Sequence, residues 1–127
     1  MSARVVHFEL PYDDGERAQK FYSEAFGWSL MPMPEMEYTV VTTGPVTQDG
    51  RPTEPGYVNG GLLPRPAAAP GTVVVVDVDD IDATLVAVER AGGSTVAGRR
   101  AVGDMGFTAY VEDSEGNVVG LWQTAAG

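Results

Sequence analysis

Two amphipathic helices stand out in the alternation of apolar and polar positions along the chain. From Ala18 the apolar residues recur three, four, seven and eight positions later, a spacing that places them on one face of a helix. Gly27 follows directly and is a typical residue just past a helix end. A second pattern of this kind covers residues 81–91 and begins after Asp79 and Asp80. The sequence therefore predicts helices over residues 16–26 and 81–91.

Short runs of β-branched and aromatic residues predict strands between and around the helices. These runs are residues 4–10, 28–33, 38–43, 57–63, 72–78, 107–111 and 118–123. Residues 95–97 and Val102 are apolar, but these stretches are short. Residues 44–56 are rich in glycine, proline, threonine and aspartate, which predicts a loop of unusual length.

The second half of the chain repeats the first at a constant offset of 66 positions, which places Asp14 on Asp80 and Gly27 on Gly93. Each half holds a strand, a helix and about three further strands. We predict an α+β fold in which two βαβββ modules form a curved mixed sheet with the helices outside. The chain is expected to be a single domain, 1–127, with module 1 at about 1–64, a linker at about 65–71 and module 2 at about 72–124.

Composition excludes several classes of function. The 127 residues include 18 acidic side chains against eight Lys and Arg, one His and no Cys, for a net charge of −10. The excess of acid argues against nucleic acid and against an anionic membrane surface as partners. Disulfides, thiolate metal sites and cysteine nucleophiles are excluded. No apolar run approaches the length of a membrane span, and no secretory signal is visible, so we expect a cytoplasmic protein.

Four segments together resemble one protein family. They are residues 5–10 (VVHFEL), residues 21–27 at the end of the first predicted helix, residues 78–82 (VDDID) and residues 112–122 (EDSEGNVVGLW). In this order and spacing they are similar to the vicinal-oxygen-chelate superfamily, which includes glyoxalases, bleomycin-resistance proteins and extradiol dioxygenases. The resemblance covers nearly the whole chain and implies the fold of two βαβββ modules. It does not specify an activity.

The resemblance also implies where a metal ligand would lie. Members that use a metal bind it through the first and last strands of each module. His7 matches the first of these positions, but the second falls on Val73 and the last-strand position of module 2 falls on Gly120. The remaining position lies near Asn59, Gly60 or Gly61. A stable divalent site needs three or four nitrogen or oxygen ligands. We therefore predict no cofactor, and His7 is a metal ligand only if a metal is present.

Strand alternation then selects the side chains of a predicted ligand pocket on the concave face of the sheet. The predicted lining residues are His7, Glu9, Tyr38, Asn59, Gly61, Phe107, Gly120 and Trp122. The face is mostly apolar, and by the resemblance Gly120 would enlarge the pocket where metal-using members have a glutamate. His7 and Glu9 are the weak candidates for catalysis, because imidazole and carboxylate groups can move protons.

Three functions follow from this pattern. The first is a metal-independent protein that binds a small organic molecule, for example by sequestering a cationic drug as bleomycin-resistance proteins do. The second is a metal-dependent lyase, isomerase or dioxygenase that uses His7 with unrecognised ligands. The third is a metal-free isomerase or hydratase with His7 or Glu9 as base. By resemblance we also expect a homodimer.

Overall fold

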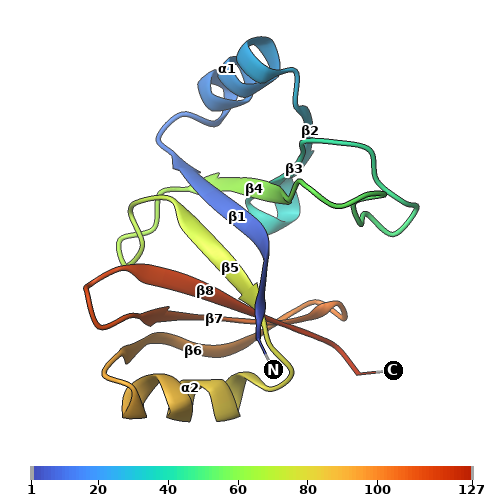
Figure 1. The fold of residues 1–127 in the computed structure, drawn as a ribbon. Coiled ribbons are helices and arrows are strands. Elements are labelled where there is room, and N and C mark those ends of the chain that lie inside the picture. The colour runs from blue at the N-terminus through green and yellow to red at the C-terminus, as the bar shows by residue number, and fades with distance from the viewer. Residues whose placement is uncertain (1, 127) are drawn as a thin grey trace. The chain divides into compact units, whose positions relative to one another are not determined.

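The computed structural model describes residues 2–126 and contains eight strands, two α-helices and one short 3₁₀ helix in that range (Figure 1). The strands are β1 (Arg4–Tyr12), β2 (Ser29–Met33), β3 (Tyr38–Thr42), β4 (Asn59–Pro64), β5 (Val73–Asp77), β6 (Ser94–Val102), β7 (Gly106–Glu112) and β8 (Val118–Thr124). The helices are α1 (Gly15–Phe26) and α2 (Ile81–Arg90), and the 3₁₀ helix is η1 (Pro34–Met36). The order confirms the predicted α+β fold of two βαβββ modules.

The chain divides into two compact units. The first unit holds residues 7–72, and the second holds residues 2–6 together with residues 73–126. In the first unit the strand order is β2-β3-β4-β1, with β1 and β4 parallel and the other neighbours antiparallel. In the second unit the order is β5-β8-β7-β6, with β5 and β8 parallel and the rest antiparallel. The two units therefore share one strand topology.

Capping residues explain where both helices begin. The Asp14 carboxylate accepts a hydrogen bond from the backbone N–H of Arg17, and Asp80 does the same for Ala83. These bonds satisfy backbone donors that a first helical turn leaves unpaired. Helix α1 ends at Gly27, whose φ of 71° is in the left-handed region that favours glycine.

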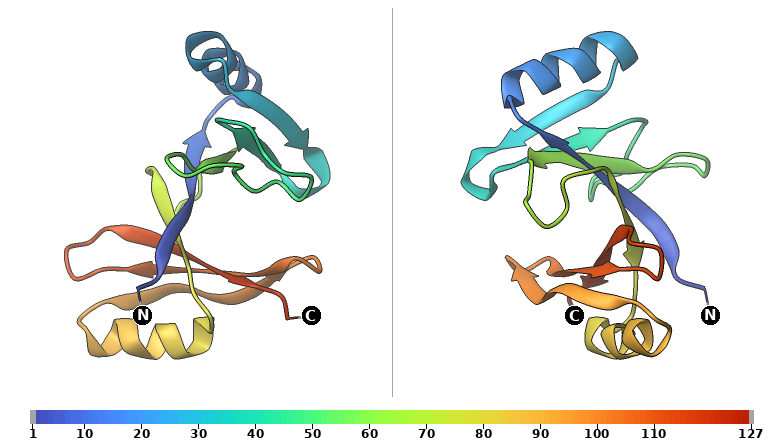
Figure 2. Two further views of the ribbon diagram at one scale, coloured as in Figure 1. Left: turned by 45° about the vertical axis from the view of Figure 1, so that its right-hand side comes forward. Right: turned by 90° about the vertical axis from the view of Figure 1, so that its left-hand side faces the viewer.

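Helix α2 covers one face of the second unit's sheet, as both views of Figure 2 show. Its Ile81 is fully buried and packs with Ala109, Val111 and Leu121 of the sheet. Leu85 and Val88 of α2 and several strand residues surround this cluster. Burying such aliphatic side chains is the main stabilising contribution to this unit. Helix α1 differs, because none of its residues is buried, although it contacts β2 and β4.

Three strands differ from their predictions, namely β6, β1 and β4, and β4 begins at Asn59 rather than at residue 57. Strand β6 runs over nine residues, whereas the sequence suggested only short apolar stretches. Its register on β7 shifts between Thr95 and Ala97 and again between Ala97 and Arg100, and such irregularities break the period-two pattern that identifies a strand. Strand β1 continues past its predicted end at Leu10 to Tyr12. Among the described residues, no helix is long and apolar enough to cross a membrane.

Candidate functional site

One face of the first unit's sheet carries five of the eight predicted pocket residues. In the parallel pair β1 and β4, His7 is the partner of Asn59 and Glu9 is the partner of Gly61. Residues that pair across neighbouring strands point to the same face. On the other side of β4, Val40 pairs with Gly61, so Tyr38 also belongs to this face, two residues away on β3. Fully buried Val41 and Leu62 belong to the opposite face.

The hydroxyl of Tyr38 joins His7 to Glu9. It donates a hydrogen bond to Oε2 of Glu9 over 3.0 Å, and it lies 2.6 Å from Nε2 of His7. Because a phenol has one proton and here gives it to the carboxylate, the bond to His7 must use the proton on Nε2. The Nδ1 atom of a neutral imidazole is then an acceptor. The sequence placed all three residues in the pocket but did not predict this chain of hydrogen bonds.

Burial controls the charge of this group. Glu9 is only 8% exposed, and His7 and Tyr38 are half-buried. Loss of solvent lowers the pKa of the His7 imidazole below its ordinary value of 6.5, and the neighbouring Glu9 carboxylate opposes this with a smaller upward effect. The neutral form of His7 is therefore favoured at pH 7. It can accept a proton or a hydrogen bond, but it offers no fixed positive charge to a ligand.

Gly61 gives the Tyr38 ring its place on the sheet. A Cβ atom on Gly61 would lie 2.0 Å from both Cζ and the hydroxyl oxygen of Tyr38. No side chain can therefore occupy position 61 while the tyrosine keeps its contacts with His7 and Glu9. The sequence predicted that this glycine would help to line a pocket, whereas in the structure the space beside it is filled by an aromatic ring. Gly60 is similarly close to Phe8 on the opposite face.

Asn59 offers an unused donor beside His7. Its Oδ1 accepts hydrogen bonds from the backbone N–H of Thr43 over 2.8 Å and from the Thr43 hydroxyl over 3.3 Å. These bonds fix the orientation of the amide. Its Nδ2 is buried and has no hydrogen-bond partner within the part of the chain that the structure describes. A buried donor without a partner is costly, so Asn59 is suited to donate to another group at this site.

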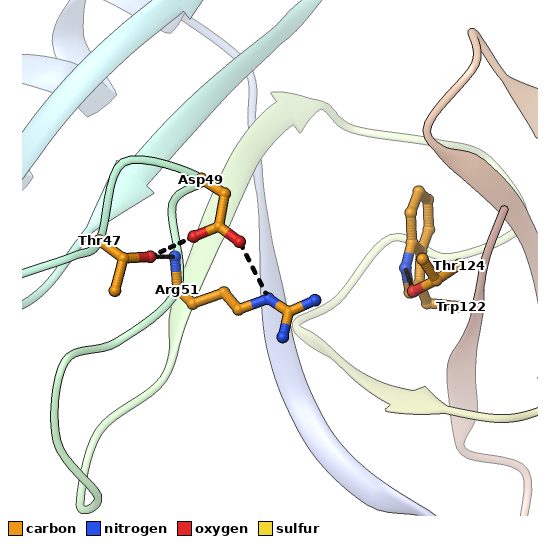
Figure 3. A network of polar contacts seen from close by, with 5 residues as sticks. All are labelled: Thr47, Asp49, Arg51, Trp122 and Thr124. Carbon is orange, nitrogen blue, oxygen red and sulfur yellow. Dashed lines mark hydrogen bonds and ion pairs between the residues drawn. The ribbon is translucent and has the colours of Figure 1, made fainter. Parts of the chain in front are cut away.

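The other three predicted pocket residues lie in the second unit. Gly120 and Trp122 share a face of β8, and Trp122 donates from its indole N–H to Thr124 over 3.1 Å (Figure 3). Phe107 does not share that face, because it pairs with Gln123. It packs against the cluster around Ile81, and the Arg99 guanidinium lies 4.7 Å from its ring centre. Phe107 therefore occupies a core position under α2 rather than a position beside Trp122.

Little space is left at Gly120. A Cβ atom there would lie 3.1 Å from Cγ2 of Val75 and 3.4 Å from atoms of Tyr110 and Val73. These side chains of the same unit already surround the glycine, which is buried. Within the second unit, the exchange of a glutamate for Gly120 therefore leaves no hollow of the size of the lost side chain.

The residues present do not fit a divalent metal site. The register makes Gly61 of β4 equivalent to Gly120 of β8, because Gly61 pairs with Glu9 and Gly120 pairs with Val75, which is 66 positions after Glu9. Both positions lack a side-chain donor, as does Val73. Nε2 of His7 is engaged by Tyr38. Among residues 2–126, no group of three or more His, Asp or Glu side chains could hold a metal ion.

The loop after β3 is held by its own polar contacts. The Thr47 hydroxyl donates to the Asp49 carboxylate, which also lies 3.4 Å from the Arg51 guanidinium (Figure 3). Val46 and Pro52 form a bridge across the loop, and the Tyr57 hydroxyl donates to the carbonyl of Pro45. The predicted long loop is thus folded on itself next to Asn59, rather than extended.

Comparison with known proteins gives a matching family model and related proteins whose names point to the same superfamily. The family model described as "Bleomycin resistance protein-like N-terminal" matches residues 4–44. A Vibrio parahaemolyticus protein named "Probable lactoylglutathione lyase" is 30% identical over 127 residues, which cover 96% of this chain and 91% of that protein. A Mycobacterium tuberculosis protein named "Putative glyoxylase CFP32" is 29% identical over 124 residues and 91% of this chain. The match covers 43% of CFP32, so the chain spans less than half the length of that relative.

A solved structure agrees with these relatives at the level of the fold. It is the crystal structure of a member of the glyoxalase/bleomycin resistance protein/dioxygenase superfamily from Vibrio splendidus 12B01. The match has a TM-score of 0.61 and 19% sequence identity, and it covers 97% of this chain and 99% of the other. At this identity the likeness concerns the fold and carries no residue roles.

Proposed function

Because the chain belongs to the vicinal-oxygen-chelate superfamily, we propose that it binds a small organic molecule on the His7 face of its first unit without using a metal. The observation that carries this proposal is the hydrogen-bonded chain His7–Tyr38–Glu9, which engages Nε2 of His7, the residue that matches a metal-ligand position of the family. A few polar groups on an otherwise apolar surface are typical of small-molecule sites. Val40 and Met33 supply apolar surface on the same face.

The chemistry of the face supports a ligand with an apolar body and polar hydrogen-bonding groups. Asn59 contributes an N–H that lacks a partner among the described residues, and His7 contributes an acceptor nitrogen. The net charge of −10 favours neutral or cationic ligands over anions. A homodimer and a cytoplasmic location remain predictions from the sequence.

A fragment library tests the binding proposal directly. Neutral and cationic aromatic fragments are screened by ¹H–¹⁵N NMR against the wild type, and we expect hits that shift residues of β1, β3 and β4. His7→Ala should weaken these hits about tenfold, the loss expected for roughly 1.4 kcal/mol of contacts. Val86→Ala, at an exposed position of α2, is the matched control and should bind as the wild type does. Failure of the whole library, or hits indifferent to His7→Ala, would contradict the proposal.

Metal analysis separates this proposal from the metal-dependent alternative. Protein purified without chelator is expected to carry less than one equivalent of Ni, Zn, Mn or Fe. A full equivalent that is lost in His7→Ala would establish the alternative instead.

A second candidate is proton transfer without a metal, with His7 as the base. The specific observation in its favour is the buried imidazole, whose pKa is lowered by loss of solvent so that its neutral form, which has one acceptor nitrogen, is favoured. If bound fragments include carbonyl compounds with an acidic C–H bond, deuterium exchange at that carbon in D₂O measures this activity. Exchange that persists unchanged in both His7→Ala and Glu9→Gln would remove it.

A further inference from the structure

The hydroxyl of Tyr38 determines which nitrogen of the single histidine carries a proton. It has one hydrogen, which it donates to Oε2 of Glu9. Its oxygen can then serve His7 only as an acceptor, and Nε2 lies 2.6 Å away. The opposite arrangement, with a bare Nε2, would need a second proton on the phenol or the loss of the bond to Glu9. The geometry therefore selects one of the two neutral tautomers.

We propose that Tyr38 is a positioning residue that holds His7 in the tautomer with its proton on Nε2 and leaves Nδ1 as the acceptor of the site. The proposal rests on the proposed function, because it specifies which atom of His7 meets a ligand. The ligand class that follows is a molecule with a hydrogen-bond donor, such as a hydroxyl or an N–H group. In an enzyme, the same atom would be the one that takes the proton.

Packing keeps Tyr38 in place for this role. Gly61 leaves the ring the space it occupies, and Glu9, which is almost completely buried, supplies the acceptor. The carboxylate of Glu9 on β1 is the charged group whose field acts on His7, and the β4 neighbour Asn59 is uncharged. Among residues 2–126, the charge that acts on the pKa of His7 thus comes from Glu9, and the hydrogen bond to the Tyr38 hydroxyl holds one edge of the imidazole ring in place.

Because His7 is the only histidine, its two ring nitrogens can be followed without assignment ambiguity. In ¹⁵N-labelled protein at pH 7.5, we expect a protonated Nε2 with an observable N–H and an unprotonated Nδ1. A cross-peak should connect the Nε2 proton with the Tyr38 ring. A wild-type spectrum with the proton on Nδ1 would overturn the proposal, whether or not any ligand is ever found.

Two tyrosine variants separate a positioning role from a general effect on the fold. In Tyr38→Phe we expect the Nε2 proton to exchange with water about 2- to 10-fold faster, as expected for the loss of one hydrogen bond. Tyr22→Phe removes a hydroxyl from α1 and should leave this exchange unchanged. Equal exchange in the wild type and Tyr38→Phe, with both proteins folded by their amide spectra, would overturn the proposal.

Ligand-bound spectra test the consequence for recognition. A fragment that binds through His7 should move the Nδ1 resonance and leave the Nε2 proton in place. A fragment that displaces Tyr38 and binds Nε2 would contradict the assignment of the acceptor atom. A library without hits would contradict the proposed function but would leave the tautomer of the free protein as measured.

Discussion

The two units use the same strand positions for different chemistry. In the first unit Glu9 of β1 pairs with Gly61 of β4, and in the second Val75 of β5 pairs with Gly120 of β8. Glu9 lies in a hydrogen-bonded chain, whereas Val75 is 6% exposed and lies against Gly120. One repeated topology thus carries a polar site in one module and an apolar surface in the other. The shared topology therefore determines the positions of these residues on the sheet but not their chemical character.

Each glycine of this pair lies next to a tyrosine, but the fit differs. A Cβ atom on Gly61 would overlap Tyr38 at 2.0 Å, while one on Gly120 would approach Tyr110 only to 3.4 Å. Tyr38 reaches across the glycine toward β1, and its hydroxyl contacts His7 there. The glycine of the first unit is therefore part of the site, because it decides whether the tyrosine can reach its partners.

The largest expected effect on stability comes from placing a carboxylate in the second unit, at the position equivalent to Glu9. Val75→Glu buries a charge that has no established partner there, and we expect it to reduce the free energy of unfolding by roughly 3–5 kcal/mol. Val74→Glu is the matched control, since Val74 is 45% exposed and its neighbour Val75 is buried. The control should change stability by about 0.5 kcal/mol or less. Urea denaturation measures both variants.

Equal stability of these two variants would break the comparison. It would mean that the second unit also accepts a carboxylate at this position, as the first unit does at Glu9.

The helices and most strands could be predicted because their signals are local. Asp14 and Asp80 cap the helices through contacts three residues away, and Gly27 ends α1 within the same segment. Strand β6 was largely missed because its two register shifts are set by pairing with β7, which lies later in the chain. Period-two reasoning identifies a strand only where one face is regularly apolar.

The sequence predicted the residues of the candidate site but not their arrangement, and their role in binding stays a prediction. The family pattern pointed to His7 and strand alternation pointed to Glu9, yet the hydroxyl that joins them comes from Tyr38, 31 residues after His7. Only the register of β3 and β4, together with a glycine at position 61, brings that ring across the sheet. The sequence predicted that Phe107 lines the pocket beside Trp122. Its position on the other face of the sheet follows from its pairing with Gln123, which the sequence alone does not reveal.

An intermediate effect is expected from one methyl group on each of the two equivalent glycines. Gly61→Ala forces Tyr38 away from its position and should cost about 1–3 kcal/mol of stability, as overpacking does. It should also remove the protection of the Nε2 proton of His7. At Gly120 the nearest atom to a new methyl is 3.1 Å away, so Gly120→Ala should change stability by less than about 1 kcal/mol.

Chemical denaturation and the histidine NMR signal measure the two alanine variants side by side. If Gly120→Ala proved as damaging as Gly61→Ala, the fit of the two tyrosines would not differ in the way described above.

The smallest expected effect is a pH dependence of stability that arises from His7 in the first unit. Burial lowers the pKa of His7 in the folded protein below its ordinary 6.5, despite the opposing field of Glu9. On acidification the unfolded chain therefore takes up this proton before the folded protein does, so the free energy of unfolding should fall between pH 7.5 and pH 5.5. The carboxylates of Asp13, Asp49 and Asp113 have pKa values below their ordinary 3.8 and titrate outside this window. His7→Gln should flatten the decline, as measured by urea denaturation at both pH values, whereas an equally steep decline in the variant would place its origin outside the His7 site.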